Sequence, residues 1–491
     1  MPALLAAVLV FVTSAAVLIL EVLAARLLAP YVGITLETYT AIIGVVLGGI
    51  ALGHYAGGRA ADRIDPRRLL GPLLVGGGLL ALTTIPLVRL FGRTDGGVGA
   101  SESQAVMLAA AGFFLPAAVL SAVSPAVVKL RLDDLGSTGT VVGRLSAIGT
   151  AGAIFGTFLA GFVLVEVAAT STSILAVGAL LVVAGLVAWV RLGTASTGAL
   201  AAAVVLAVGG GAVTVGLDAI CDVETTYHCA RVVSDPGRPS GRELVLDTLR
   251  HSYVDLDDPT YLQFRYLQVF ADVVDSQRPA GSLDALHLGG GGFTFPRYVG
   301  ATRPGSTNVV LEIDAGLVDL AADRLGLEAE PGLAVRVGDA RLLLGGLDAA
   351  SRDVVVGDAF GGLAVPWHLT TREAVGEVRR VLRPDGIYVA NLIDYPPLRF
   401  VRAEIATLQR TFASVAVLAP PAVIDGDDGD NVVLVASAEP IDVAALERAI
   451  AARGGVERVL VDDDAFAFAG GAPVLTDDRA PVDQWLARSA R

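Results

Sequence analysis

Four consecutive glycines, Gly289–Gly292, follow an apolar run at residues 283–288. Glycine lets the backbone turn sharply and approach a bound ligand closely, because it has no side chain and tolerates positive φ angles. A strand that ends in glycines and leads into a helix is one way to build a nucleotide site. We therefore predict that Gly289, Gly290 and Gly291 contact a cofactor, although the same residues also suit a tight turn.

Carboxylates accompany three later apolar runs. Glu312 lies about 20 residues beyond the glycines, where an acidic side chain can accept hydrogen bonds from ribose hydroxyl groups. Asp314 is a second candidate, and it equally suits a helix N-cap. Asp339, with Ala340 beside it, is placed for an adenine amino group, and Asp358 falls at the centre of the expected cleft. The four strand ends together predict a site for an adenosyl ligand.

Short β-rich runs alternate with helical stretches in this half of the chain. Such alternation is typical of a parallel sheet covered by helices on both faces, and ligands bind at the carboxyl ends of its strands. Two later runs, 414–418 and 431–436, are interpreted as the closing hairpin of a seven-stranded sheet of the methyltransferase type. The expected strands are 283–288, 308–313, 334–337, 353–356 and 387–390, and the expected helices include 315–325 and 371–381.

The N-terminal half is far more apolar. The protein has a mean hydropathy of +0.64 and is 54% hydrophobic, which is too apolar for an ordinary soluble protein. Residues 1–218 carry a net charge of +1, whereas residues 219–491 carry −15. Glycines in the second and fifth apolar runs, among them Gly53 and Gly152, favour close helix packing. The runs long enough to span a bilayer are 3–25, 37–57, 69–91, 105–130, 142–165, 172–190 and 198–217.

These patterns predict the fold class and the domain organisation. We expect a membrane all-α bundle of about seven transmembrane helices, followed by an α/β Rossmann-like domain with a small β-module at its N-terminus. The transmembrane domain covers residues 1–218, the β-module or lid 219–280, and the Rossmann-like domain 281–491. An aromatic-rich helix is expected at 261–274, at the end of the β-module.

The basic residues of the loops bear on membrane orientation. Eight lie on one side of the predicted spans and three on the other, so the side with eight should be cytoplasmic. With seven helices, the C-terminal domain would then lie outside the cytoplasm. A cytosolic adenosyl donor would favour the opposite side. We expect a multi-pass protein of the cell membrane, in contact with the lipid bilayer, and leave the side of the C-terminal domain open.

Composition narrows the remaining functional classes. Cys221 and Cys229 are the only cysteines, too few for a zinc site, and they form either two free thiols or one disulfide. The sequence contains no metal-ligand cluster, so no metal is expected. The acidic half would repel the phosphates of a nucleic acid, which excludes that partner, but it suits a cationic substrate such as a polyamine. The sequence is also compatible with a homo-oligomer.

The strand-end residues resemble those of the spermidine synthase family of aminopropyltransferases. The whole chain resembles the fused bacterial form, in which a major-facilitator-like membrane domain precedes a spermidine-synthase-like domain. The motifs that carry the resemblance are ETTYH at 224–228, LHLGGG at 286–291, LEID at 311–314, GDA at 338–340, DVVVGD at 353–358 and LTDDRAP at 475–481.

The resemblance implies transfer of the aminopropyl group of decarboxylated S-adenosylmethionine to a small-molecule amine, the family default being a polyamine. Glu312 would bind the ribose and Asp339 the adenine. Asp358 would accept the proton of the attacking amine, or stabilise that amine, because an ammonium has no lone pair.

Further positions follow from the same resemblance. It would place Tyr227 and His228 near the cofactor or the substrate entrance. His251 and Tyr253 could line the cleft. Trp367, together with Phe360, instead suggests an apolar acceptor site that departs from the family pattern, although both side chains also suit a hydrophobic core.

Two positions depart from the family pattern. An aspartate that holds the free amine of the donor is replaced by Gly292, and a second aspartate three residues after Asp358 is replaced by Gly361. Both changes remove anionic partners for amines. Two alternatives therefore stay open: a methyltransferase that uses S-adenosylmethionine itself, or a non-catalytic nucleoside-binding module attached to a transporter-like membrane domain.

Overall fold

The computed structural model describes residues 1–33, 36–92, 102–132, 138–216, 219–327, 332–362 and 365–489. By the density of contacts, the chain divides into two compact units. The first comprises residues 1–230 with 246–248, and the second residues 231–245 with 249–491. The predicted domain boundaries after residues 218 and 280 stay a prediction.

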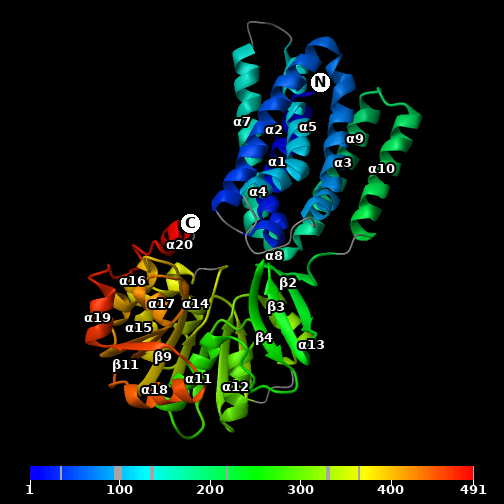
Figure 1. Ribbon diagram of the computed structural model, residues 1–491. Helices are drawn as coiled ribbons and strands as arrows, with labels where there is room; N and C mark the ends of the chain where they lie inside the picture. Colours follow the sequence, from blue (N-terminus) through cyan, green and yellow to red (C-terminus); the bar gives the residue numbers. More distant parts are fainter. Residues whose placement is uncertain are drawn as a thin grey trace. The chain divides into compact units, whose positions relative to one another are not determined.

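The first unit is dominated by helices (Figure 1). Among the described residues, seven helical spans are long and apolar enough to cross a membrane, which confirms the predicted number. The fourth and fifth spans are not regular α-helices throughout, because π-helical turns interrupt them at Ala110–Phe114 and Ala160–Leu164. The α-helices are α1 (Ala3–Val32), α2 (Leu36–Arg63), α3 (Pro66–Gly92), α4 (Glu102–Ala109), α5 (Leu115–Ser121), α6 (Val123–Arg131), α7 (Thr138–Leu159), α8 (Val165–Val167), α9 (Thr170–Arg191) and α10 (Thr197–Gly216).

Glycines allow these helices to pack closely. A Cβ atom added to Gly152 of α7 would lie 2.3 Å from the carbonyl oxygen of Phe11 in α1, and one added to Gly53 of α2 would lie 2.1 Å from that of Ala118 in α5. Any larger side chain would force the backbones apart. Lipid offers no hydrophobic drive for association, so small residues at the contact matter more in a membrane than in water.

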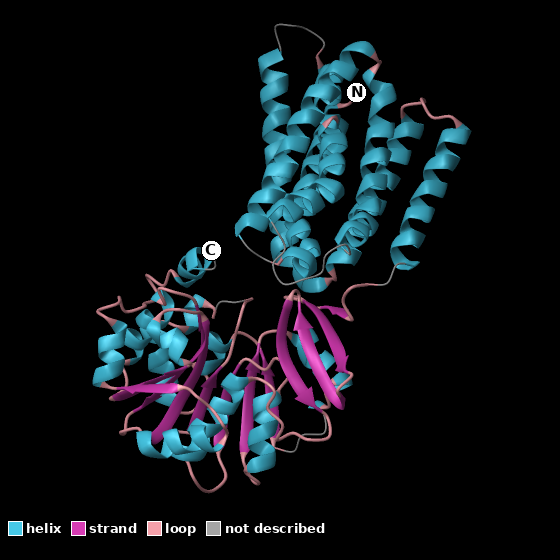
Figure 2. Cartoon of the chain, in the orientation of Figure 1, coloured by secondary structure: helices cyan, strands magenta, loops and turns pink. Residues whose placement is uncertain are grey.

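A four-stranded antiparallel module follows the helices (Figure 2). Its strands are β1 (Val223–Glu224), β2 (Cys229–Asp235), β3 (Arg238–Leu246) and β4 (Leu249–Asp255), in the order β1-β2-β3-β4. Cys221 and Cys229 form a disulfide, so of the two expectations the paired one is met.

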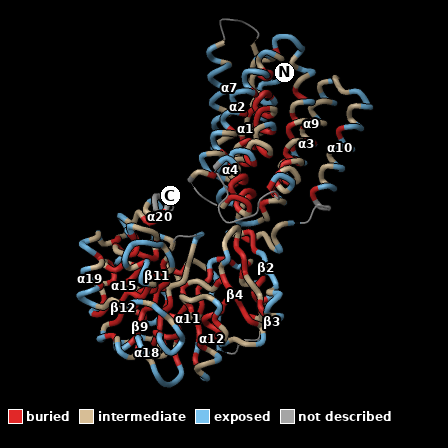
Figure 3. Tube along the Cα trace, viewed as in Figure 1, coloured by how far each residue is buried: buried red, intermediate tan, exposed pale blue. Residues whose placement is uncertain are grey.

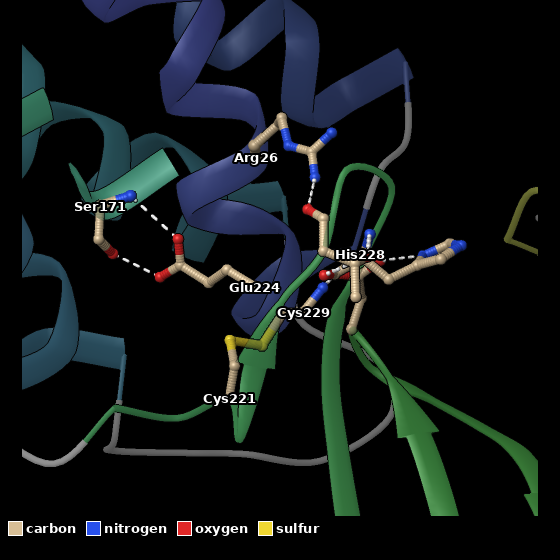
Figure 4. Close-up of a disulfide and its surroundings, with 8 residues drawn as sticks. Arg26, Ser171, Cys221, Glu224, His228 and Cys229 are labelled. Carbon is tan, nitrogen blue, oxygen red and sulfur yellow. Dashed lines mark hydrogen bonds and ion pairs between the residues drawn. A yellow bond between two sulfur atoms is a disulfide. The ribbon is translucent and has the colours of Figure 1, made fainter. Parts of the chain in front are cut away.

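The turn between β1 and β2 is tied to the membrane helices within the first unit (Figure 4). Arg26 of α1 donates to the carbonyl oxygens of Thr225 and Thr226. The backbone N–H of Ser171, at the start of α9, donates to Glu224 at 2.9 Å, and the Ser171 hydroxyl donates to the same carboxylate.

The rest of the second unit is an α/β domain built on an eight-stranded sheet of order β12-β10-β11-β9-β8-β5-β6-β7. Strands β5 to β9 are parallel, whereas β11 pairs antiparallel with both β9 and β10. The expected closing hairpin is therefore present, and β12 adds one strand beyond the seven predicted. The strands are β5 (Asp284–Leu288), β6 (Thr307–Glu312), β7 (Leu333–Val337), β8 (Arg352–Gly357), β9 (Leu382–Asp394), β10 (Ser414–Ala419), β11 (Asp430–Ser437) and β12 (Arg458–Val461).

Helices cover both faces of this sheet, as the strand–helix alternation predicts. Successive residues of β10 are buried on opposite sides, Val417 with Phe400 and Leu418 with Phe270, because side chains alternate along a strand. Figure 3 shows the buried residues along these strands. The helices are α11 (Arg265–Gln277), α12 (Thr294–Thr302), α13 (Ala315–Arg324), α14 (Ala340–Leu344), α15 (Arg372–Val381), α16 (Arg399–Leu408), α17 (Pro421–Asp425), α18 (Val443–Ala452), α19 (Asp463–Ala469) and α20 (Val482–Ser489).

The packing of α7 on α1 gives a prediction. Gly152→Leu should lower the melting temperature of the full chain in detergent, because its side chain would meet the backbone at Phe11; overpacking typically costs about 1–3 kcal/mol. Gly143→Leu is the matched control, since nothing lies within 4 Å of a Cβ at this exposed position of the same helix. Equal melting temperatures for the two variants would contradict the close contact.

Candidate functional site

The glycine run forms a tight loop at the carboxyl end of β5. Gly289 has a φ angle of +94°, and a Cβ atom there would lie 2.5 Å from the carbonyl oxygen of Asp358. Gly291 has a φ angle of +51°, and its Cβ atom would lie 2.8 Å from the ring of His251. Both positions therefore require glycine. The loop passes close to the end of β8 on one side and to β4 on the other.

Glu312 joins this loop to the end of β6. Its Oε2 atom accepts hydrogen bonds from the N–H groups of Gly290 and Gly291 at 2.7 and 3.3 Å, and its Oε1 atom accepts from the N–H of Asp314 at 2.9 Å. The side chain is buried. Because a carboxylate has about four acceptor positions, Oε1 keeps capacity for one more donor. Glu312 is thus a firmly held acceptor that fits a ribose hydroxyl.

Asp314 and Asp339 both cap helices. Asp314 Oδ1 accepts from the N–H groups of Gly316 and Leu317 at the start of α13. Asp339 Oδ1 accepts from the N–H of Arg341 at the start of α14, in which Ala340 is the first residue. The Oδ2 atom of Asp339 lies 3.5 Å from Nε2 of His368. Their cofactor contacts stay a prediction, and capping is the role that the geometry displays.

Asp358 follows β8 and lines a cavity of about 300 Å³. Its carboxylate accepts hydrogen bonds from the hydroxyl of Tyr266 at 3.2 Å and from Nδ2 of Asn391 at 3.1 Å. Burial raises the pKa of Asp358 to about 6, against the opposing effect of the two hydrogen bonds. A carboxyl group with this pKa can accept a proton near neutral pH and release it readily.

The cavity contains an apolar wall and several charged groups. Aromatic side chains come from α11 and its N-cap and from the loop after β8. The lining residues are Leu249, Arg250, His251, Phe264, Arg265, Tyr266, Val269, Asp358, Phe360, Gly362, Asn391, Ile393, Leu418, Ala419, Pro420, Asp430, Asn431, Val433 and Glu457.

Of the predicted substrate residues, only His251 lines this cavity together with Asp358. Tyr253 is buried in the β-module, where its hydroxyl donates to Asp235 at 2.8 Å, and Trp367 is half-exposed beside His368. Neither is among the lining residues. The sequence could not reveal this, because the neighbours that engage these two side chains are set by tertiary contacts.

Tyr227 and His228 line a different cavity, of about 40 Å³, within the first unit. The Nδ1 atom of His228 lies 3.0 Å from the carboxylate of Asp247, which also accepts from the N–H of Cys229. The predicted contacts of Tyr227 and His228 with cofactor or substrate stay a prediction. In the structure, the described hydrogen-bond partners of His228 are Thr225 of its own β1–β2 turn and Asp247 of the β3–β4 turn.

Sequence reasoning missed Tyr266 and Asn391, the two partners of Asp358. Asn391 directly follows the predicted strand 387–390, so the same strand-end rule that selected Asp358 would have found it. Tyr266 lies in the aromatic-rich segment noted in the sequence, but no local signal shows that its hydroxyl reaches Asp358. That contact depends on how α11 packs against the sheet.

Position 292, where the resemblance expects an aspartate, is closed by β4. The N–H of Gly292 donates to the hydroxyl of Ser252 at 3.0 Å, and a Cβ atom at 292 would lie 2.7 Å from the Cβ of Ser252. An aspartate here would have to displace the backbone of β4 or of the loop. The close packing of the loop against β4 therefore accounts for a glycine, and not an aspartate, at position 292.

The pKa of Asp358 gives a prediction for Tyr266→Phe. The lost hydroxyl normally donates to the carboxylate and lowers its pKa, so its removal should raise that pKa further. The acid limb of a plot of kcat/KM against pH, near pH 6 in the unaltered protein, should then move to higher pH. Tyr261→Phe is the control, because its hydroxyl bonds Gln263 instead. An unmoved limb would show that Asp358 does not govern the profile.

Comparison with known proteins finds partial similarity to polyamine aminopropyltransferases. No model of a known protein family matches the chain. A polyamine aminopropyltransferase of Vibrio vulnificus is 32% identical over 108 residues, which are 22% of this chain and 36% of that protein. A polyamine aminopropyltransferase of Chromobacterium violaceum is 25% identical over 159 residues, 32% of this chain and 60% of that protein. The chain thus spans less than two thirds of the length of each.

A solved structure described as a probable spermidine synthase from Corynebacterium glutamicum is 28% identical. The match covers 54% of this chain and 99% of that one, with a TM-score of 0.49. The curated relatives support a spermidine-synthase-like domain in the C-terminal half of the chain.

Proposed function

We propose that the protein is a membrane-anchored transferase that moves the aminopropyl group of decarboxylated S-adenosylmethionine to an amine. The observation that carries this proposal is Asp358, a carboxylate with neutral partners and a raised pKa that lines a cavity beside the glycine loop. The partial matches to polyamine aminopropyltransferases support the same reaction.

The reaction needs a group that accepts a proton at the acceptor amine. A new C–N bond forms as the C–S bond of the sulfonium breaks, and the electron pair of that bond leaves with the neutral thioether, methylthioadenosine. The amine must lose a proton, since an ammonium has no lone pair for attack. Asp358 accepts this proton, and its neutral partners Tyr266 and Asn391 leave its charge available to orient the amine.

The donor would lie along the strand ends. Glu312 would accept a hydrogen bond from a ribose hydroxyl of the donor. The protein backbone at Gly289–Gly291 could approach the donor closely, because no side chains are present there. Asp339 and Ala340 flank the adenine. The protein residues present fit an adenosyl group.

Methyl transfer from S-adenosylmethionine is the second candidate. The observation that favours it is Gly292, whose contact with Ser252 leaves no room for the aspartate that the resemblance expects to bind the free amine of the decarboxylated donor. The two reactions differ in the mass that the acceptor gains. They also differ in which donor binds more tightly.

Product analysis with the full chain in detergent tests both candidates. The unaltered protein should convert decarboxylated S-adenosylmethionine and a diamine to the aminopropylated product. Asp358→Asn should lower kcat about 100-fold or more, the usual effect of losing a general base. Asp323→Asn, on the exposed face of α13, should have no effect.

Donor binding is measured in parallel by calorimetry, with Asp339→Ala as the weakened control. Tighter binding of S-adenosylmethionine and a methylated product would establish the alternative. If neither donor binds to folded protein, the domain does not use an adenosyl donor.

We further propose that the soluble part lies outside the cytoplasm. The disulfide between Cys221 and Cys229 suits an oxidising compartment, and the number of spans together with the loop charges favours the same side. The donor would then have to be supplied on that side of the membrane. We also propose that the membrane domain is major-facilitator-like. This part of the proposal rests on the motif resemblance alone.

Single-cysteine labelling tests this placement. Because the native cysteines are paired, Asp323→Cys in the soluble part and Asp65→Cys between α2 and α3 each add one exposed thiol that reacts without reductant. An impermeant maleimide applied to intact cells should label the Asp323→Cys protein and spare the Asp65→Cys protein. The reverse pattern would place the soluble part in the cytoplasm.

A further inference from the structure

The motif LTDDRAP at 475–481 forms a turn near the C-terminal end of the described chain. None of its residues lines the cavity of about 300 Å³. The backbones of Thr476 and Arg479 exchange two hydrogen bonds, of 3.1 and 2.8 Å, so the chain reverses within two residues. Asp477 and Asp478 are those two residues, and their side chains extend from the tip of the turn.

Leu475 fixes this turn to the core of the α/β domain. Its side chain is buried in the same apolar cluster as Ala340 of α14 and Leu369 of the segment before α15. Its N–H donates to the buried hydroxyl of Thr407 at 2.9 Å, and its carbonyl oxygen accepts from the N–H of Arg372 at 2.9 Å. The core therefore places the turn beside α14 and α15, whatever residues stand at its tip.

The carboxylate of Asp477 joins the starts of these two helices. Its Oδ2 atom accepts from Nη2 of Arg341 in α14 at 2.9 Å, and its Oδ1 atom accepts from the hydroxyl of Thr371 at 2.6 Å. Thr371 is the N-cap of α15, where its hydroxyl oxygen accepts from the N–H of Ala374. The N–H of Asp477 donates to Glu373 in the first turn of the same helix at 3.1 Å. One residue thus bonds to both helix starts.

Asp339 lies where these two helix starts meet. Its Oδ1 atom accepts from the N–H of Arg341 at the start of α14, and its Oδ2 atom lies 3.5 Å from Nε2 of His368, in the short turn before α15. The separation of the two helix starts therefore sets the surroundings of the Asp339 carboxylate. Asp339 is the residue proposed above to contact the adenine.

We infer that Asp477 is a positioning residue for the adenine end of the donor site. Through Arg341 and Thr371 it holds the starts of α14 and α15 at one separation, and so holds Asp339 in place. The inference rests on the proposed binding of an adenosyl donor. Because Asp477 lies on the helix starts and not in the cavity with Asp358, it affects how tightly the donor binds and leaves the chemical step unchanged.

Calorimetry and steady-state kinetics with the full chain in detergent test this role. Asp477→Ala should weaken the binding of methylthioadenosine about fivefold, the upper end of what one exposed ion pair contributes. The KM for decarboxylated S-adenosylmethionine should rise by a similar factor, whereas kcat and the KM for the amine should not change. Asp478→Ala is the matched control, since this exposed aspartate of the same turn is not among the described partners of α14 or α15.

A second nucleoside separates positioning from a general loosening of the domain. Methylthioinosine has a ring carbonyl in place of the amino group that Asp339 would accept from, so the unaltered protein should prefer methylthioadenosine. Asp477→Ala should reduce this preference, whereas general loosening would weaken both nucleosides by the same factor. Asp477→Asn should have an intermediate effect, because it keeps an oxygen for Thr371 and loses the charge opposite Arg341.

The outcomes distinguish this inference from the proposed function. Equal binding of methylthioadenosine to Asp477→Ala and to the unaltered protein, or an equal loss for both nucleosides, would overturn the role of Asp477 even if transfer occurs. If Asp477→Ala does not fold, Asp477→Asn gives the same comparison. If methylthioadenosine does not bind to the folded unaltered protein, the adenosyl site is rejected, and the role of Asp477 is rejected with it.

Discussion

The hydrogen bonds of Asp358 to Tyr266 and Asn391 connect three separate elements at the carboxyl ends of the central strands. Asp358 follows β8, Asn391 belongs to β9 and Tyr266 to α11. A carboxylate removed from bulk water needs donors, and here those donors are neutral. The negative charge is therefore held without being cancelled, as the proposed reaction requires of a group that attracts an amine and then accepts its proton. An arginine at either position would keep the carboxylate ionised at lower pH and would compete with the substrate.

The ion pairs of the second unit engage the arginines near α11 with carboxylates other than Asp358. Arg265 is bound by Glu457 near β12, and Arg453 of the segment after α18 is bound by Asp272 of α11. These pairs attach α11 to the sheet edge and keep cationic side chains occupied. Partly exposed ion pairs add little to the free energy of unfolding. The main effect of these pairs is therefore to position α11. The position of Tyr266 depends on that attachment.

In the first unit, polar groups of the β1–β2 turn are likewise satisfied by hydrogen bonds from side chains and backbone of the helices. The β1–β2 turn presents carbonyl oxygens that Arg26 satisfies, and Glu224 is satisfied by the N–H and hydroxyl of Ser171. Together with the disulfide, these contacts hold the turn that contains Tyr227 and His228 against α1 and α9. The motif at 224–228 therefore has a structural role in this chain, whatever its part in binding.

Periodicity and composition were sufficient for the large-scale organisation, because spans of about 20 apolar residues and alternating strands and helices are local patterns. They also predicted that Glu312, Asp339 and Asp358 lie at strand ends, which is where the structure has them. The carboxyl ends of parallel strands meet on one side of a sheet, so these residues are brought to the same side. The sequence could not choose between two thiols and a disulfide. It also could not show that Asp314 and Asp339 cap helices, that Tyr253 and Trp367 stay outside the cavity, or that Tyr266 and Asp430 line it. Those facts depend on contacts between residues far apart in the chain, and only the packing of α11, β9 and β11 around Asp358 decides them.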